Sequence, residues 1–171
     1  PYIIKSYQDI VKDPKDTIVF DEELHNQIDR QKEDLGADGA LLKTPKGDVY
    51  HVNMLEKLLA TVLAKMSNFV PEAGIWLNTQ RPEWNDANNA LVGNGTSMVT
   101  LYYMRRFFTF FDNLIDSVDF SSSPISEELY DFFKEISTQL TKHESLLANK
   151  IGDQERQSFV DAVGQAGSSS V

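Results

Sequence analysis

Apolar residues recur at helical spacing over long stretches of this sequence, and this periodicity limits the fold more than any other feature. The clearest stretch covers residues 54–69, where apolar positions follow one helix face until Pro71 interrupts the pattern. Asn53, with Glu56 three residues later, is typical of a capping box at the start of such a helix. The sequence therefore predicts a mainly α protein.

Further stretches carry the same kind of signal. Asp21 is a suitable N-cap for a short surface helix that ends at Gly36, and the acidic residues after the cap suit the positive end of its dipole. Thr96 or Ser97 caps a long helix whose apolar residues nearly encircle it. Such a helix needs partners on several sides, so we expect its aromatic side chains to pack in the core. Two more helices are predicted, over 125–147 and from Asp153 onward.

Other segments lack a sustained period. Residues 1–20 are expected to be mostly irregular, and residues 40–52 to form one small β-hairpin around the turn Thr44-Pro45-Lys46-Gly47. Residues 71–95 are expected to form a long ordered loop, of the kind that is usually functional. We predict a single helical domain over 1–166, followed by a flexible tail over 167–171.

Charge and composition narrow the classes of partner. The net charge of −10 argues against nucleic acid, because phosphate-backbone binding depends on clustered Lys and Arg. The most apolar segment, 98–118, contains four charged residues, so we expect no membrane span. The absence of cysteine excludes a disulfide framework and a thiolate metal site. No metal site is expected on the three scattered histidines, and localisation stays open with a slight preference for the cytoplasm.

The polar segment 71–95 holds both tryptophans of the chain, Trp76 and Trp84. Indole faces can stack on sugar rings, and amide, carboxylate and guanidinium groups can pair with sugar hydroxyls. An alternative is that the tryptophans only pin the loop and that Arg81 pairs with Glu83. The residues predicted to bind an oligosaccharide or glycoside are Trp76, Asn78, Gln80, Arg81, Trp84, Asn85, Asn88 and Asn89.

Carboxyl groups in the same segment suit acid–base chemistry on a glycosidic bond. Asp86 and Glu83 both lie close to Trp84 in sequence, and an apolar wall such as indole raises a carboxyl pKa. An inverting hydrolase needs a second carboxylate roughly 6.5 to 9.5 Å away, and Glu72 is the obvious candidate within the segment. The predicted catalytic residues are therefore Asp86, Glu83 and Glu72.

The string Glu83-Trp84-Asn85-Asp86, followed by Ala87-Asn88-Asn89, resembles the Trp-Asn-Asp element of inverting glycoside phosphorylases of the cellobiose phosphorylase type. The resemblance implies an (α/α)6 toroid, Asp86 as general acid and inorganic phosphate as co-substrate. It also implies that Trp84 and Asn85 shape the sugar subsite. Glu83 replaces the family's usual Asp, which leaves hydrolysis and phosphorolysis open. The wider run 74–106 is similar to a segment of long, uncharacterised bacterial proteins of carbohydrate metabolism.

A toroid of this kind has twelve helices, whereas the sequence predicts five. We therefore expect antiparallel helical hairpins that form part of a toroid, with little activity from this chain alone. The remainder of a larger chain, or a second copy, is expected to complete it. Gly93-Asn94-Gly95, before the long helix, could offer backbone N–H groups to phosphate. A non-catalytic module that binds a glycan or a protein, and a purely structural fragment, are the alternatives.

Overall fold

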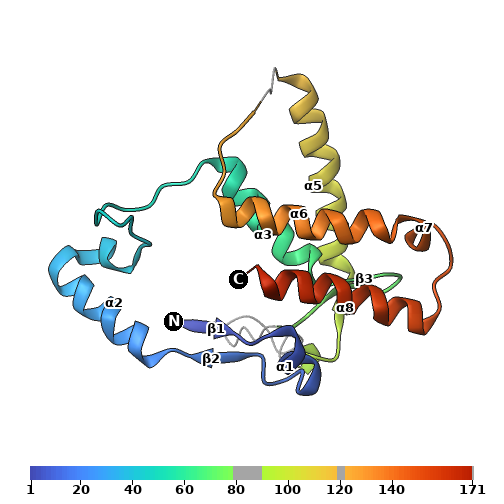
Figure 1. The fold of residues 1–171 in the computed structure, drawn as a ribbon, viewed down its shortest axis with the longest axis horizontal. Coiled ribbons are helices and arrows are strands. Elements are labelled where there is room, and N and C mark those ends of the chain that lie inside the picture. The colour runs from blue at the N-terminus through green and yellow to red at the C-terminus, as the bar shows by residue number, and fades with distance from the viewer. Residues whose placement is uncertain (79–89, 119–121, 171) are drawn as a thin grey trace.

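The computed structural model describes residues 1–78, 90–118 and 122–170 (Figure 1). It is mainly helical with small antiparallel sheets, which confirms the predicted class. The core lies where three helices meet. These are α3 (Met54–Met66), α6 (Glu127–Lys142) and α8 (Asp153–Ser169).

Helices α6 and α8 form an antiparallel hairpin, and the short helix α7 (Glu144–Leu147) lies in their connection (Figure 1). Phe159 and Val163 of α8 are completely buried. Burial of each such side chain contributes about 1.5–3 kcal/mol. The central cluster consists of Leu63, Leu129, Phe132, Ile136 and Ala166.

The predicted helix after Asn53 is confirmed as α3, but its start differs from a capping box. The Asn53 side chain accepts a hydrogen bond from the backbone N–H of Glu56, at 2.8 Å. The buried Glu56 carboxylate does not return to Asn53, because it accepts from the backbone N–H of Ser126 before α6, at 3.1 Å. Glu56 thus joins the starts of α3 and α6.

A small antiparallel sheet follows α3, in the order β3 (Phe69–Val70), β4 (Gly74–Trp76) and β5 (Thr96–Ser97). Two expectations are corrected here. The helix ends at Met66 instead of 69, and the segment 71–95 is not a loop at its start, because residues 74–76 form the central strand. The strands are too short to show a period, and burial of Ile75 fixes β4 in place.

The first twenty residues are also more ordered than predicted. Strand β1 (Tyr2–Ile4) pairs antiparallel with β2 (Ile18–Phe20), and α1 (Tyr7–Lys12) lies between them. Ser6 caps α1 by accepting from the backbone N–H of Asp9. Both strands are largely exposed, so their apolar residues mark no obvious core face in the sequence.

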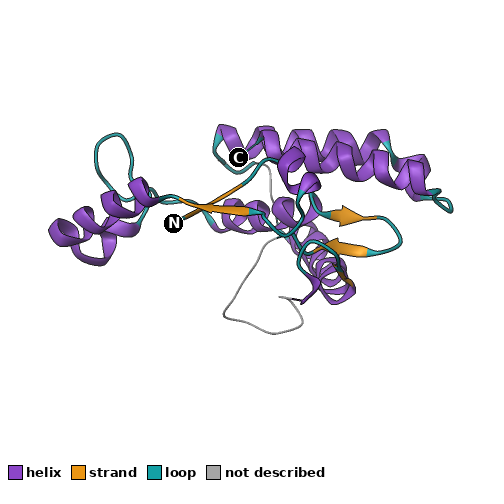
Figure 2. Ribbon diagram, turned by 90° about the horizontal axis from the view of Figure 1, so that it is seen from below, coloured by secondary structure: helices purple, strands orange, loops and turns teal. Residues whose placement is uncertain are grey.

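Next in the chain is an arm that extends away from the helical core (Figure 1, Figure 2). Helix α2 (Glu22–Leu35) begins after the predicted cap Asp21, which accepts from Leu24 N–H at 2.8 Å, and is followed by a 3-10 turn (Gly36–Ala40). The predicted hairpin over 40–52 is reduced to one β-bridge, Lys43 with Val49. Its turn forms as predicted, but no strands extend from it.

Helix α5 (Met98–Ser117) begins at the predicted cap Ser97, whose hydroxyl accepts from Thr100 N–H at 3.1 Å. The expectation of core packing is wrong for this helix. Only Met104 is buried, and the C-terminal half projects from the body (Figure 1). Within the described part of the chain no helix, α5 included, combines the length and apolarity needed to cross a bilayer.

The last helix also differs from prediction. Gly152 is its N-cap instead of Asp153, and the Glu155 carboxylate accepts from Gly152 N–H at 3.0 Å. Residues 167–169, expected in a flexible tail, continue α8 because Gly167 packs closely against Ser67.

Candidate functional site

A cavity of about 740 Å³, here named the Trp76 cavity, lies in the described part of the chain. Its walls come from the N-terminal segment, the end of α3, strand β4, the start of α5 and the C-terminal half of α8. Both apolar and polar side chains line it. The lining residues are Ile3, Ile4, Lys5, Ser6, Tyr7, Ile10, Ala64, Lys65, Ser67, Asn68, Ile75, Trp76, Leu77, Asn78, Ser97, Thr100, Phe132, Gly164, Gly167 and Ser168.

Two residues predicted to bind a saccharide, Trp76 and Asn78, line this cavity. The indole Nε1–H of Trp76 donates to the Gly93 carbonyl at 3.1 Å, so the ring is held by its polar edge. The Asn78 amide donates from Nδ2 to Asn68 Oδ1 at 2.7 Å. The Asn68 amide nitrogen in turn donates to the Ala64 carbonyl at 2.8 Å, which fixes the orientation of both side chains.

Tyr7 also lines the cavity and ties the N-terminal segment to α8. Its backbone N–H donates to the Ser168 hydroxyl at 3.0 Å, and its own hydroxyl donates to Asp161 at 2.7 Å. Burial, together with the hydrogen bond to Asp161, raises the pKa of Tyr7 above its ordinary value of 10.0. The neutral phenol is therefore favoured in the folded protein.

Glycines of α8 allow this close approach. A Cβ added at Gly164 would lie 2.2 Å from the Tyr7 ring, and one at Gly167 would lie 2.5 Å from the Ser67 Cβ. Glycine is needed at both positions on steric grounds. Two glycines three residues apart in a helix indicate a close approach of another segment, and this signal was not used in the prediction. Tyr7, Lys65 and Asn68 were also not predicted as site residues.

Glu72 lies elsewhere. It occupies the turn between β3 and β4 with a positive φ of 63°, and its carboxylate pairs with Arg156 at 2.7 Å. Arg156 is about 12 Å from Gly164 along the axis of α8, at 1.5 Å per residue. Glu72 is not among the residues that line the Trp76 cavity. The remaining predicted site residues, Gln80, Arg81, Glu83, Trp84, Asn85, Asp86, Asn88 and Asn89, lie outside the described part of the chain.

The turn at Gly93-Asn94-Gly95 does not offer the free N–H groups expected for phosphate. Gly93 N–H donates to the Leu77 carbonyl at 2.7 Å, and the N–H groups of Asn94 and Gly95 both donate to the Leu91 carbonyl. These bonds correct the prediction, because all three donors already have acceptors. Leu77 N–H also donates to the Gly95 carbonyl at 3.0 Å. The chain therefore returns beside Leu77, next to the cavity.

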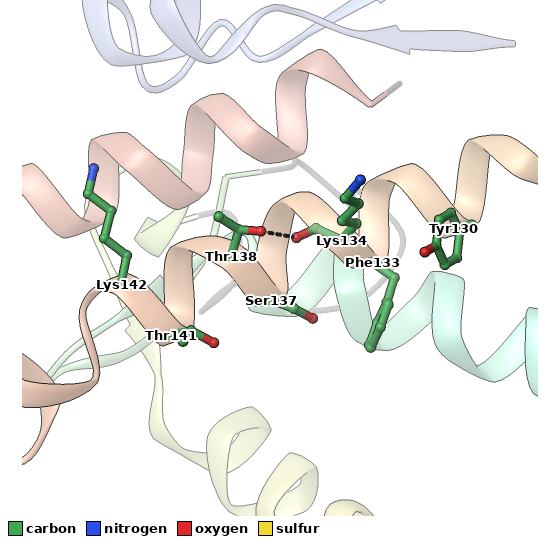
Figure 3. A pocket seen from close by; sticks show the side chains of 7 residues that line it. All are labelled: Tyr130, Phe133, Lys134, Ser137, Thr138, Thr141 and Lys142. Atoms are coloured by element: carbon green, nitrogen blue, oxygen red, sulfur yellow. Dashed lines mark hydrogen bonds between the residues drawn. The ribbon is translucent and has the colours of Figure 1, made fainter.

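Across residues 1–78, 90–118 and 122–170, no three His, Asp or Glu side chains gather closely enough to hold a metal ion. A second hollow lies along α6, and Figure 3 shows that one helix supplies all of its labelled residues, Phe133 and Tyr130 among them. A hollow lined by a single helix is open surface and cannot enclose a ligand.

Comparison with known protein families and with curated proteins finds no match for this chain.

Proposed function

We propose that this chain binds a saccharide in the Trp76 cavity, as part of a carbohydrate-active protein. The observation that carries the proposal is the joint presence of Trp76 and Asn78 in one cavity, beside Asn68 and Lys65. Its volume of about 740 Å³ lies within the ~300–1,000 Å³ of typical small-molecule sites.

The chemistry of the walls suits a sugar. Because the Trp76 N–H is occupied by Gly93, the indole can contribute only its apolar surface to a ligand. Such a surface complements the CH-lined face of a sugar ring. Hydroxyl and amide side chains supply directional partners for sugar hydroxyls. The polar lining residues include Asn68, Asn78, Ser97 and Thr100.

Catalysis by Asp86 as general acid is the second part of the proposal. Support comes from the residues that flank the segment containing Asp86. Leu77, which lines the cavity, accepts a backbone hydrogen bond from Gly93 and donates one to Gly95. Glu83 is the better auxiliary carboxylate, because Glu72 pairs with Arg156 and does not line the cavity. Hydrolysis and phosphorolysis both remain open, with inorganic phosphate as the co-substrate of the latter.

An (α/α) toroid is proposed for the complete assembly. The antiparallel α6–α8 hairpin is a repeat unit that such a toroid could use. The alternative is a non-catalytic helical module, and the exposed apolar residues of α5 favour protein binding as its role.

The test is a screen for sugar release from oligosaccharides, with and without phosphate, on the protein and its Asp86→Asn variant. The proposal expects release by the wild type, a large loss of turnover in Asp86→Asn, and retained binding. Asn113→Ala, at an exposed asparagine on α5, is the matched control and should leave turnover unchanged. Binding without release in any condition would support the non-catalytic module, and neither binding nor release would reject the proposal.

A further inference from the structure

Helix α5 carries an apolar stripe whose members are exposed in the described part of the chain, except for the half-buried Phe107. Val99, Tyr103, Phe107, Phe110 and Leu114 follow each other at intervals of four, four, three and four residues. At 100° per residue they fall within about 80° of the helix circumference. Tyr103 and Phe110 are 64% and 63% exposed, and Val99 is 65% exposed. These five residues are the α5 stripe.

We infer that the α5 stripe is the contact surface for a second copy of this chain, paired antiparallel about a two-fold axis. A two-fold axis that crosses the helix pair between Arg106 and Phe107 places Val99 of one copy opposite Leu114 of the other. The same axis places Tyr103 opposite Phe110. The stripe is thus self-complementary, as a two-fold interface requires. Neither a saccharide nor catalysis is needed for this contact.

The area agrees with this pairing. The stripe exposes on the order of 500 Å² of side chain per copy, so a pair that covers it buries about 1,000 Å² on α5 alone. Specific interfaces begin at about that size. The residue types also fit, because Tyr and Arg are enriched at binding hot spots. Arg106 stands beside the stripe with its guanidinium 5.7 Å from the centre of the Tyr103 ring.

The net charge opposes pairing, so the strength of association should depend on the salt concentration. Each copy carries a net charge of −10, so two copies repel each other at low ionic strength. Screening weakens that repulsion, whereas contacts within the apolar stripe are largely unaffected. Association should therefore strengthen as salt is added.

Sedimentation equilibrium of the purified chain over a range of concentrations tests the inference. The wild type is expected to dimerise, and Phe110→Lys to raise the dissociation constant at least tenfold. Tyr103→Lys should act in the same way. Thr109→Lys is the matched control, because it adds the same charge to the same helix about 120° away from the middle of the stripe. Circular dichroism checks that each variant keeps its helices.

A wild-type chain that stays monomeric at every concentration would overturn the inference. So would a dimer that Phe110→Lys and Thr109→Lys weaken equally, because the contact would then lie elsewhere. Weakening by added salt would also contradict it. None of these outcomes depends on whether the protein binds a sugar, so the result is separate from the test of the Trp76 cavity.

Discussion

Arg156 at the start of α8 donates to Glu72 in the β3–β4 turn, with 2.7 Å between Nη2 and Oε2, although 84 positions separate the two residues. The same guanidinium donates to the carbonyls of Pro71 and Ile151 and pairs with Asp153. Hydrogen bonds to Glu72 and Asp153 raise the pKa of Arg156 above its ordinary value. One side chain thus joins the small sheet to the helical core.

Replacing this arginine should loosen the sheet from the core. Arg156→Gln removes the charge and most of the donors, which leaves the Pro71 carbonyl with fewer partners. We expect Arg156→Gln to lower the thermal unfolding temperature. Glu72→Gln should also lower it, and most of that loss should vanish when Arg156 is already replaced by Gln. Lys12→Gln, which breaks an exposed pair with Asp9, is the control. If Lys12→Gln and Arg156→Gln lower the unfolding temperature equally, Arg156 has no special role.

Gly164 should tolerate a side chain only when Tyr7 is removed. Gly164→Ala places a Cβ 2.2 Å from the Tyr7 ring, so the ring must move. Such overpacking typically costs about 1–3 kcal/mol, despite the better helix propensity of alanine. In a Tyr7→Ala background the same change should instead stabilise by up to about 1 kcal/mol. Urea unfolding of the wild type, the two single variants and the double variant measures these free energies. If Gly164→Ala still destabilises the protein when Tyr7 is replaced by Ala, the contact is contradicted.

Stability should depend on the Tyr7 phenol at alkaline pH. Because the folded-state pKa lies above 10.0, the contribution of the neutral phenol is complete below pH 10 and is lost as pH rises further. Tyr7→Phe lacks the bond to Asp161 and should be less stable near neutral pH. The gap between the two proteins should be constant up to about pH 10 and should narrow at higher pH. A gap that stays constant in urea unfolding up to about pH 11 would refute the assignment.

Two phenylalanines should differ sharply in what they contribute. Phe159 of α8 is 0% exposed, and Phe159→Ala should lower the free energy of unfolding by about 3–5 kcal/mol. Phe110→Ala, on α5, should change it by no more than about 0.5 kcal/mol in dilute protein. Chemical unfolding measures both values. A large loss for Phe110→Ala at low concentration would mean that α5 packs within its own chain.

The sequence predicted helices best where one face is apolar. The pattern after Asn53 led to α3, and Asp21 and Ser97 cap the helices that they were expected to cap. Strands β3 to β5 were missed because two or three residues carry no period. The prediction that α5 packs in the core was wrong. An apolar sequence shows that a helix needs partners, but it does not show whether the same chain supplies them.

The candidate site was predicted in part. Trp76 and Asn78 were identified from their side-chain chemistry, and they line one cavity. Tyr7 and Ser168 could not be found in that way, because they meet through contacts across 161 positions. Asn68 was overlooked as part of a helix, although it directly orients Asn78.

The most direct measurement of the central claim is a nuclear magnetic resonance titration of the isotope-labelled chain with a panel of oligosaccharides. The Trp76 indole N–H signal, assigned with Trp76→Phe, and the side-chain amides of Asn68 and Asn78 should shift together and saturate. The Asn113 amide on α5 should stay in place. If no saccharide moves the Trp76 and Asn78 signals, the Trp76 cavity is not a sugar site.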